Sequence, residues 1–173
     1  MKAHFTVLIF LFLTLGSISE KAYGQQSDAH SAEGKANVLN PIGLLNVDEQ
    51  SLNFGNIAIG NLTSTITIVA QEETSISVTD GDAKILGTTT QTAAKFQVTG
   101  EVGRSYNISL PLSMNVSNGT DNLLMDQFTS SVLNNSGIIN SSTIFYVGAR
   151  LHVPTNKSLG VYSGSFNVEV SYE

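Results

Sequence analysis

Short runs in which apolar and polar residues alternate are the feature that most limits how this chain can fold. They recur from about residue 36 to the C-terminus and are separated by glycine, asparagine, aspartate and proline. Successive side chains of a β-strand point to opposite faces, so a period of two predicts half-buried strands rather than helices. The clearest run ends the chain, where one face would carry Phe166, Val168, Val170 and Tyr172.

A second long alternation lies upstream of the C-terminal one. Pro154 ends this run, because proline has no amide hydrogen to donate to a neighbouring strand. The two runs are close in sequence, and we predict that they pair as a hairpin. The expected inward face of the upstream strand consists of Phe145, Val147, Ala149, Leu151 and Val153.

Shorter runs predict strands in the middle of the chain, at residues 62–70, 74–78, 94–98 and 106–110. Turn-forming residues separate them at 79–82 and 117–120. Residues 123–133 are ambiguous between a strand and one short helix. The side chains expected to face inward from the middle strands are Leu62, Ile66, Ile68, Ile76, Val78 and Phe96.

The first predicted strand region contains Val38, Ile42 and Leu44. Pro41 interrupts it, which fits an edge strand or a bulged strand. The following segment, residues 52–55, would place Leu52 and Phe54 in the core.

Seven or more short strands at this spacing predict an all-β fold, and we expect an immunoglobulin-like antiparallel β-sandwich. Residues 36–173 are numerous enough for one domain with a core of its own. The chain has no cysteine, which excludes disulfides, thiolate metal sites and cysteine nucleophiles.

The N-terminus has the features of a secretion signal. Lys2 supplies a positive charge, residues 5–15 are almost entirely apolar, and Ala22 and Gly24 place small residues where a signal peptidase cleaves. The apolar run is shorter than the roughly 20 residues that cross a bilayer. We expect a signal peptide at residues 1–24, a mobile polar leader at 25–35, and no transmembrane segment. The protein would then be exported to the periplasm, the cell surface or the medium.

The charge of the chain argues against nucleic acid as a partner. The formal net charge is -6, and removal of residues 1–24 leaves six basic and thirteen acidic residues, a charge of -7. An acidic surface repels phosphate backbones, and the basic residues are too scattered in sequence to predict a compensating patch.

No pattern predicts an enzyme active site. After export only His30, in the leader, and His152, on an outward strand face, could serve as a catalytic base, and neither is placed for a triad. Asp80 and Asp82 flank a turn glycine but lack the further spaced acids of a calcium loop. No glycine-rich loop opens a helix to seat a nucleotide. The sequence predicts no catalytic residue, no metal centre and no cofactor.

Tyr146, expected on an outward strand face, is a weak candidate for ligand binding, because exposed aromatic rings form the platforms of carbohydrate-binding sandwiches. Tryptophan is absent, so the platform would rest on this ring. A carbohydrate or envelope-ligand binding module that works as a monomer is therefore our alternative functional hypothesis.

Several segments resemble the bacterial family catalogued as domain of unknown function 4402. The resemblance spans about residue 36 to residue 173, and the family is itself similar to spore coat protein U and, more remotely, to chaperone-usher pilins. It implies an exported all-β domain. The segments that carry it are residues 36–42 (ANVLNPI), 52–55 (LNFG), 96–100 (FQVTG), 151–154 (LHVP) and 160–166 (GVYSGSF).

The likeness to pilins implies assembly by strand addition, in which an extension of one subunit enters a groove of the next. Such pilins have a glycine about fourteen residues before the end and a penultimate aromatic residue, the places of Gly160 and Tyr172 here. Residues 25–35 lack apolar alternation, so residues 36–47 would have to be exchanged. The resulting assembly-strand candidates are Val38, Ile42, Leu44, Gly160, Phe166, Val168, Val170 and Tyr172.

We therefore expect a non-enzymatic surface or fimbria-like structural subunit of a bacterial envelope. Its expected partners are copies of itself or other envelope subunits, together with a periplasmic chaperone.

Overall fold

The computed structural model describes residues 30–31, 33–87 and 91–173. The predicted signal peptide and most of the predicted leader lie outside these residues. The chain divides into two units at Ala36, and residues 37–173 form the larger one. In the smaller unit, the described residues are exposed and belong to no strand or helix.

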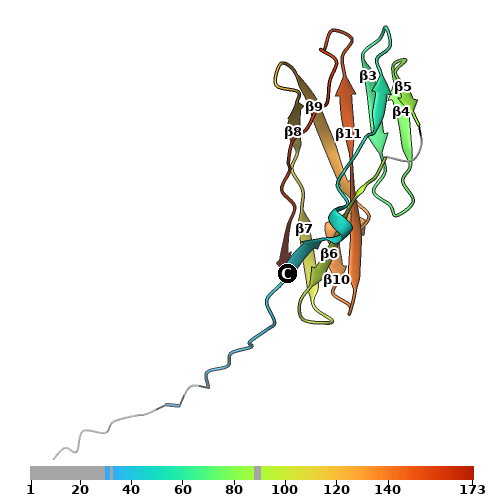
Figure 1. Ribbon diagram of the computed structural model, residues 1–173. Coiled ribbons are helices and arrows are strands. Elements are labelled where there is room, and N and C mark those ends of the chain that lie inside the picture. The colour runs from blue at the N-terminus through green and yellow to red at the C-terminus, as the bar shows by residue number, and fades with distance from the viewer. Residues whose placement is uncertain (1–29, 32, 88–90) are drawn as a thin grey trace, which may run out of the picture. The chain divides into compact units, whose positions relative to one another are not determined.

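Strand β11, Thr143–Val153, is the centre of the larger unit (Figure 1). Its first half pairs with β6, Ala94–Thr99, and its second half pairs with β3, Ser64–Ile68. Strand β9, Asn122–Ser130, pairs with β11 as well. The sheet is completed by β1 (Gly43–Asn46) beside β6, β4 (Ile76–Asp80) beside β3, and β8 (Ser113–Ser117) beside β9.

Two smaller sheets accompany the seven-stranded one. The first has the order β10 (Ser136–Ile138), β7 (Ser105–Ser109), β12 (Glu169–Tyr172). The second pairs β2 (Asn56–Ala58) with β5 (Lys84–Leu86). The helical elements of the described residues are two short 3-10 turns, η1 (Val47–Glu49) and η2 (Leu133–Asn135). Every strand pair is antiparallel, so the predicted all-β class is confirmed.

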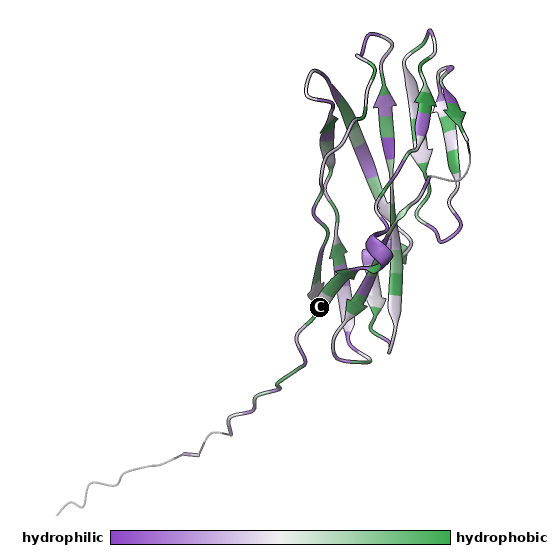
Figure 2. Ribbon diagram, viewed as in Figure 1, coloured by the Kyte–Doolittle hydropathy of each residue, from purple (hydrophilic) through white to green (hydrophobic). Residues whose placement is uncertain are grey.

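The core consists of two apolar clusters that share the inward face of β11. The first cluster holds Ile66, Ile68 and Leu151, and the second holds Phe145, Val98 and Tyr106. Apolar and polar residues alternate along the strands in Figure 2, as a sheet with one buried face requires. This arrangement fits a β-sandwich, whereas the immunoglobulin-like topology stays a prediction.

The predicted faces of the two C-terminal runs are confirmed. The predicted inward face of β11 is buried along its whole length. Phe166, Val168, Val170 and Tyr172 are half-buried and pack against the second cluster.

The predicted hairpin between these runs is wrong. Strand β12 pairs with β7, and Val170 lies opposite Ile108. Further back, Ser163 bridges to Ser117 at the end of β8, so the C-terminal segment runs alongside β7 and β8 (Figure 1). The neighbours of β11 are β3, β6 and β9, which leaves both of its edges occupied.

One ambiguity is resolved and one further expectation needs correction. Of the two alternatives left open for residues 123–133, the structure has a strand: residues 122–130 form β9, and Leu123 and Met125 are buried on its inward face. Leu62 precedes β3 and is 61% exposed rather than inward-facing. The other expected positions hold, because Ile66 and Ile68 are buried and Ile76 and Val78 pack against the first cluster.

No helix among residues 30–31, 33–87 and 91–173 is long and apolar enough to cross a bilayer.

Candidate functional site

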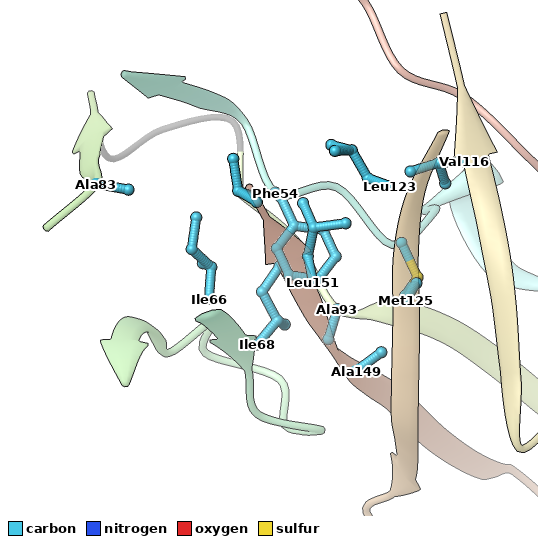
Figure 3. Packing of buried hydrophobic residues seen from close by; sticks show 11 residues of the cluster. Phe54, Ile66, Ile68, Ala83, Ala93, Val116, Leu123, Met125, Ala149 and Leu151 are labelled. Atoms are coloured by element: carbon cyan, nitrogen blue, oxygen red, sulfur yellow. The ribbon is translucent and has the colours of Figure 1, made fainter. Parts of the chain in front are cut away.

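A cleft of about 660 Å³ opens beside the first core cluster, and we call it the apolar cleft after the side chains of its floor. Its floor is the inward face of three neighbouring strands, β8, β9 and β11. Because successive side chains point to opposite faces of a sheet, each strand directs its apolar side chains into the cleft and its polar side chains to the other face. Figure 3 shows the side chains of Val116, Leu123 and Met125 close together, with Leu151 and Phe54 beside them. The floor residues are Met114, Val116, Leu123, Met125, Leu151 and Val153.

One rim of the apolar cleft is the segment from Ser51 to Ile59. Phe54 is buried against the first cluster, and Ile57 and Ile59 pack on it while half-exposed. Strand β2 in this rim pairs with β5 and with no other strand among the described residues. Its second edge therefore has backbone groups free to pair with an added strand.

The other rim is formed by Lys157–Gly164 and Phe166. Ser163 and Ser117 exchange two backbone hydrogen bonds, of 2.8 and 3.0 Å. Gly164 fits closely against β8, because a Cβ atom there would lie 2.7 Å from Met114 Cε. This rim thus follows the edge of β8 that does not face β9. The other backbone edge of the rim has no strand partner in the described part of the chain.

Asp121 holds this second rim in place from the turn between β8 and β9. Its Oδ2 accepts hydrogen bonds from the backbone N–H of Ser158 over 2.8 Å and from the Ser158 hydroxyl over 2.6 Å. Lys157 Nζ lies 3.5 Å from Oδ1. The bonds from Ser158, followed by the charge of Lys157, lower the pKa of Asp121 below its ordinary value. The Tyr162 hydroxyl also donates to Ser158 O over 2.7 Å.

Charge is scarce in the apolar cleft. Lys157 is the charged side chain among the described lining residues, and Asp121 pairs with it. The described lining offers mainly apolar side chains on the floor and backbone edges on the rims. It suits an uncharged extended segment better than a charged ligand.

The assembly-strand candidates are divided between two places. Gly160 and Phe166 line the apolar cleft, and Gly160 has a positive φ of 148° that favours glycine. Five others surround the second core cluster within the same unit: Ile42, Leu44, Val168, Val170 and Tyr172. Val38 belongs to neither group, since it lies outside the strands and is 91% exposed.

Tyr146 is half-buried and packs against the first cluster. Burial and the nearby Glu72 carboxylate raise its pKa. A ring held in this way presents less than a full face to a sugar. On the outward face of β11, His152 Nε2 lies 3.0 Å from Asp126 Oδ1.

The two carboxylates considered for calcium stabilise local backbone. Asp82 accepts from the amides of Asn61 and Leu62, both over 2.8 Å, and Asp80 accepts from that of Gly81. The described residues contain no group of three or more histidine, aspartate or glutamate side chains that could hold a metal ion.

Sequence reasoning missed the floor strand β8 and the role of Asp121. An Asn-Gly pair at 118–119, between alternating runs at 113–117 and 122–130, is a strong hairpin signal that would have identified β8 and β9. No local signal links Asp121 to Ser158, because this contact joins segments far apart in the chain.

Comparison with known proteins identifies a family. A search of curated proteins and a search of solved structures found no significant match. The profile of the family described as domain of unknown function (DUF4402) matches residues 45–172. That match begins within β1 and ends within β12, so it includes the cleft floor and both rims. The chain belongs to the DUF4402 family.

Proposed function

We propose that this protein is a non-enzymatic, exported structural subunit of a bacterial surface, fimbria-like in its assembly. In this proposal the apolar cleft accepts an extended strand from another copy or another envelope subunit. The observation that carries it is the pair of rims: two backbone edges that have no strand partner among the described residues border a floor of apolar side chains.

The chemistry of the apolar cleft favours a strand over a small polar ligand. An incoming strand would satisfy backbone donors and acceptors along the rims. Its alternate apolar side chains would cover Met125, Val116 and their neighbours on the floor. The carboxylate of Asp121 compensates the charge of Lys157, so the strand would bring no charge of its own to that end.

The predicted secretion signal and relation to pilins agree with this role, and a periplasmic chaperone would protect the open cleft before assembly. The five assembly-strand candidates around the second core cluster act in cis in this proposal. Strand β1 already pairs with β6, and β12 already pairs with β7. The exchanged segment is therefore not residues 43–46, which form the strand within the segment 36–47 that the sequence suggested.

The absence of cysteine gives a direct test. Ile57→Cys places a single thiol on the β2 rim, and Ser77→Cys places one on the exposed outward face of β4 as a control. We expect alkylation of the Ile57→Cys thiol to slow about tenfold in surface-assembled protein relative to free protein, while the control thiol reacts equally in both.

Equal alkylation of the Ile57→Cys thiol in both states would contradict strand acceptance by the cleft. A protein that stays monomeric on its native cells and binds glycans through Tyr146 would instead support the alternative hypothesis.

A further inference from the structure

The cleft rim from Lys157 to Tyr162, called the strap below, is held mainly by side chains. Strand β11 ends at Val153 and β12 begins at Glu169. In the described structure, the segment between them pairs with a strand at Ser163, which bridges to Ser117. Within the part of the chain that the structure describes, Lys157–Tyr162 makes no backbone pairing of its own with a strand. Segments with few backbone and apolar contacts open locally at much lower free energy than the whole domain.

The two apolar side chains in the middle of the strap face solvent. Leu159 is 85% exposed and Val161 is 86% exposed, although both residues line the mouth of the apolar cleft. Gly160 between them has a positive φ of 148°, which gives the backbone a conformation that other residues rarely adopt. The closed position of the strap therefore does not derive from burial of these side chains.

The strap is anchored at its two ends. Asp121 accepts both hydrogen bonds of Ser158 and pairs with Lys157 at one end. At the other end the half-buried ring of Tyr162 packs on the first core cluster, and its hydroxyl donates to Ser158 O. Asn118 Nδ2 also donates to Ser158 O, over 3.5 Å. Four hydrogen bonds thus meet at Ser158, and the Asp121 carboxylate accepts two of them.

We propose that the strap is a latch, held closed by Asp121 and Ser158, which must be released before a strand can enter the apolar cleft fully. Release moves one rim away from the β8–β9 turn and lengthens the accessible floor. This inference rests on the proposed function and adds a point of control to the same site. Leu159 and Val161 are then free to pack on the incoming strand.

The test compares Asp121→Asn with Asp126→Asn. The control is closely matched, because both carboxylates are near β9 and their side chains are 24% and 27% exposed. Asp126 faces His152 on the outward side of the sheet, away from the strap. The probe is a peptide of about nine residues in which valine alternates with threonine.

Amide hydrogen exchange reports the latch. We expect the Ser158 amide of Asp121→Asn to exchange about tenfold faster than in the unaltered protein, while the Ser163 amide, bonded to Ser117 O, changes little. We also expect Asp121→Asn to bind the peptide about tenfold more tightly, because less of its binding free energy is spent on opening. Asp126→Asn should change neither quantity.

Each other outcome is decisive. Equal peptide affinity in Asp121→Asn and the unaltered protein overturns the latch and leaves the proposed function standing. Faster Ser158 exchange without peptide binding to either protein overturns the proposed function, and the latch with it. If Asp121→Asn melts at a much lower temperature, Tyr162→Phe removes one bond to Ser158 from the opposite end. Unchanged exchange and affinity in that variant would then refute the latch.

Discussion

The Tyr172 hydroxyl donates a hydrogen bond to the carbonyl oxygen of Asn40, 2.6 Å away. It also accepts one from the backbone N–H of Glu101, over 2.7 Å. A Cβ atom on Gly100 would lie only 2.5 Å from the hydroxyl oxygen, so glycine allows this close approach. The penultimate aromatic residue thus joins the last strand to the segment before β1 and to the loop after β6.

The first prediction concerns this junction. Tyr172→Phe keeps the ring against the second cluster but leaves Asn40 O and Glu101 N without their partner. We expect a loss of about 1–3 kcal/mol in the free energy of unfolding, measured with urea, because the Glu101 bond is partly buried. Tyr162→Phe is the control, since its single bond is exposed and should matter less. Equal losses in the two variants would refute the junction.

Phe166 gives the second prediction. Its ring packs on Phe128 with centroids 5.0 Å apart, and it also contacts the second cluster. Phe166→Ala should lower the free energy of unfolding by about 2–4 kcal/mol, since it removes a large, half-buried side chain that packs on Phe128 and the second cluster. Val161→Ala, five residues earlier and 86% exposed, should change it by less than about 0.5 kcal/mol. Similar thermal melts for both variants would show that the Phe166 face is not a core face.

The sequence was sufficient to predict which side of most strands is buried. In β11 the alternation of large apolar and polar side chains leaves one arrangement that buries Phe145 and Leu151 together, and the structure has it. Leu62 was misplaced because it lies before the strand, where the turn and not the pleat sets its direction.

The same alternation could not predict which strands pair with each other. Alternation assigns faces but contains no information on which strand lies alongside, so nearness in sequence suggested a hairpin between β11 and β12. In the structure β12 pairs with β7, more than fifty residues earlier. The apolar cleft depends on such distant pairings, because its rims come from residues 51–59 and 157–166. Candidates chosen from terminal strands therefore included only two lining residues, Gly160 and Phe166.

The third prediction concerns the junction of β11 with β3. Gly148 has no space for a side chain, because a Cβ atom would collide with the backbone of Ile68 and Ala70. Gly148→Ala should destabilise the domain by about 1–3 kcal/mol, since backbone must shift to relieve the overlap. Gly34→Ala is the control, as a Cβ atom there would meet nothing within 4 Å. A neutral Gly148→Ala variant in urea unfolding would show that the two strands are less closely joined.

The last prediction concerns acid. Hydrogen bonds from the amides of Asn61 and then Leu62 lower the pKa of Asp82 in the folded protein. A carboxyl group with a lowered folded-state pKa contributes stability above its unfolded pKa of about 3.9 and loses it as the pH falls through the folded value. Asp82→Asn should therefore be less stable than the unaltered protein at pH 7, and the difference should shrink in urea titrations carried below that range. The Asp80 carboxylate accepts one amide hydrogen bond, so Asp80→Asn should lose less stability than Asp82→Asn at pH 7. If the difference in unfolding free energy between Asp82→Asn and the unaltered protein persists in acid, the ionised Asp82 carboxylate does not stabilise the backbone at Asn61 and Leu62.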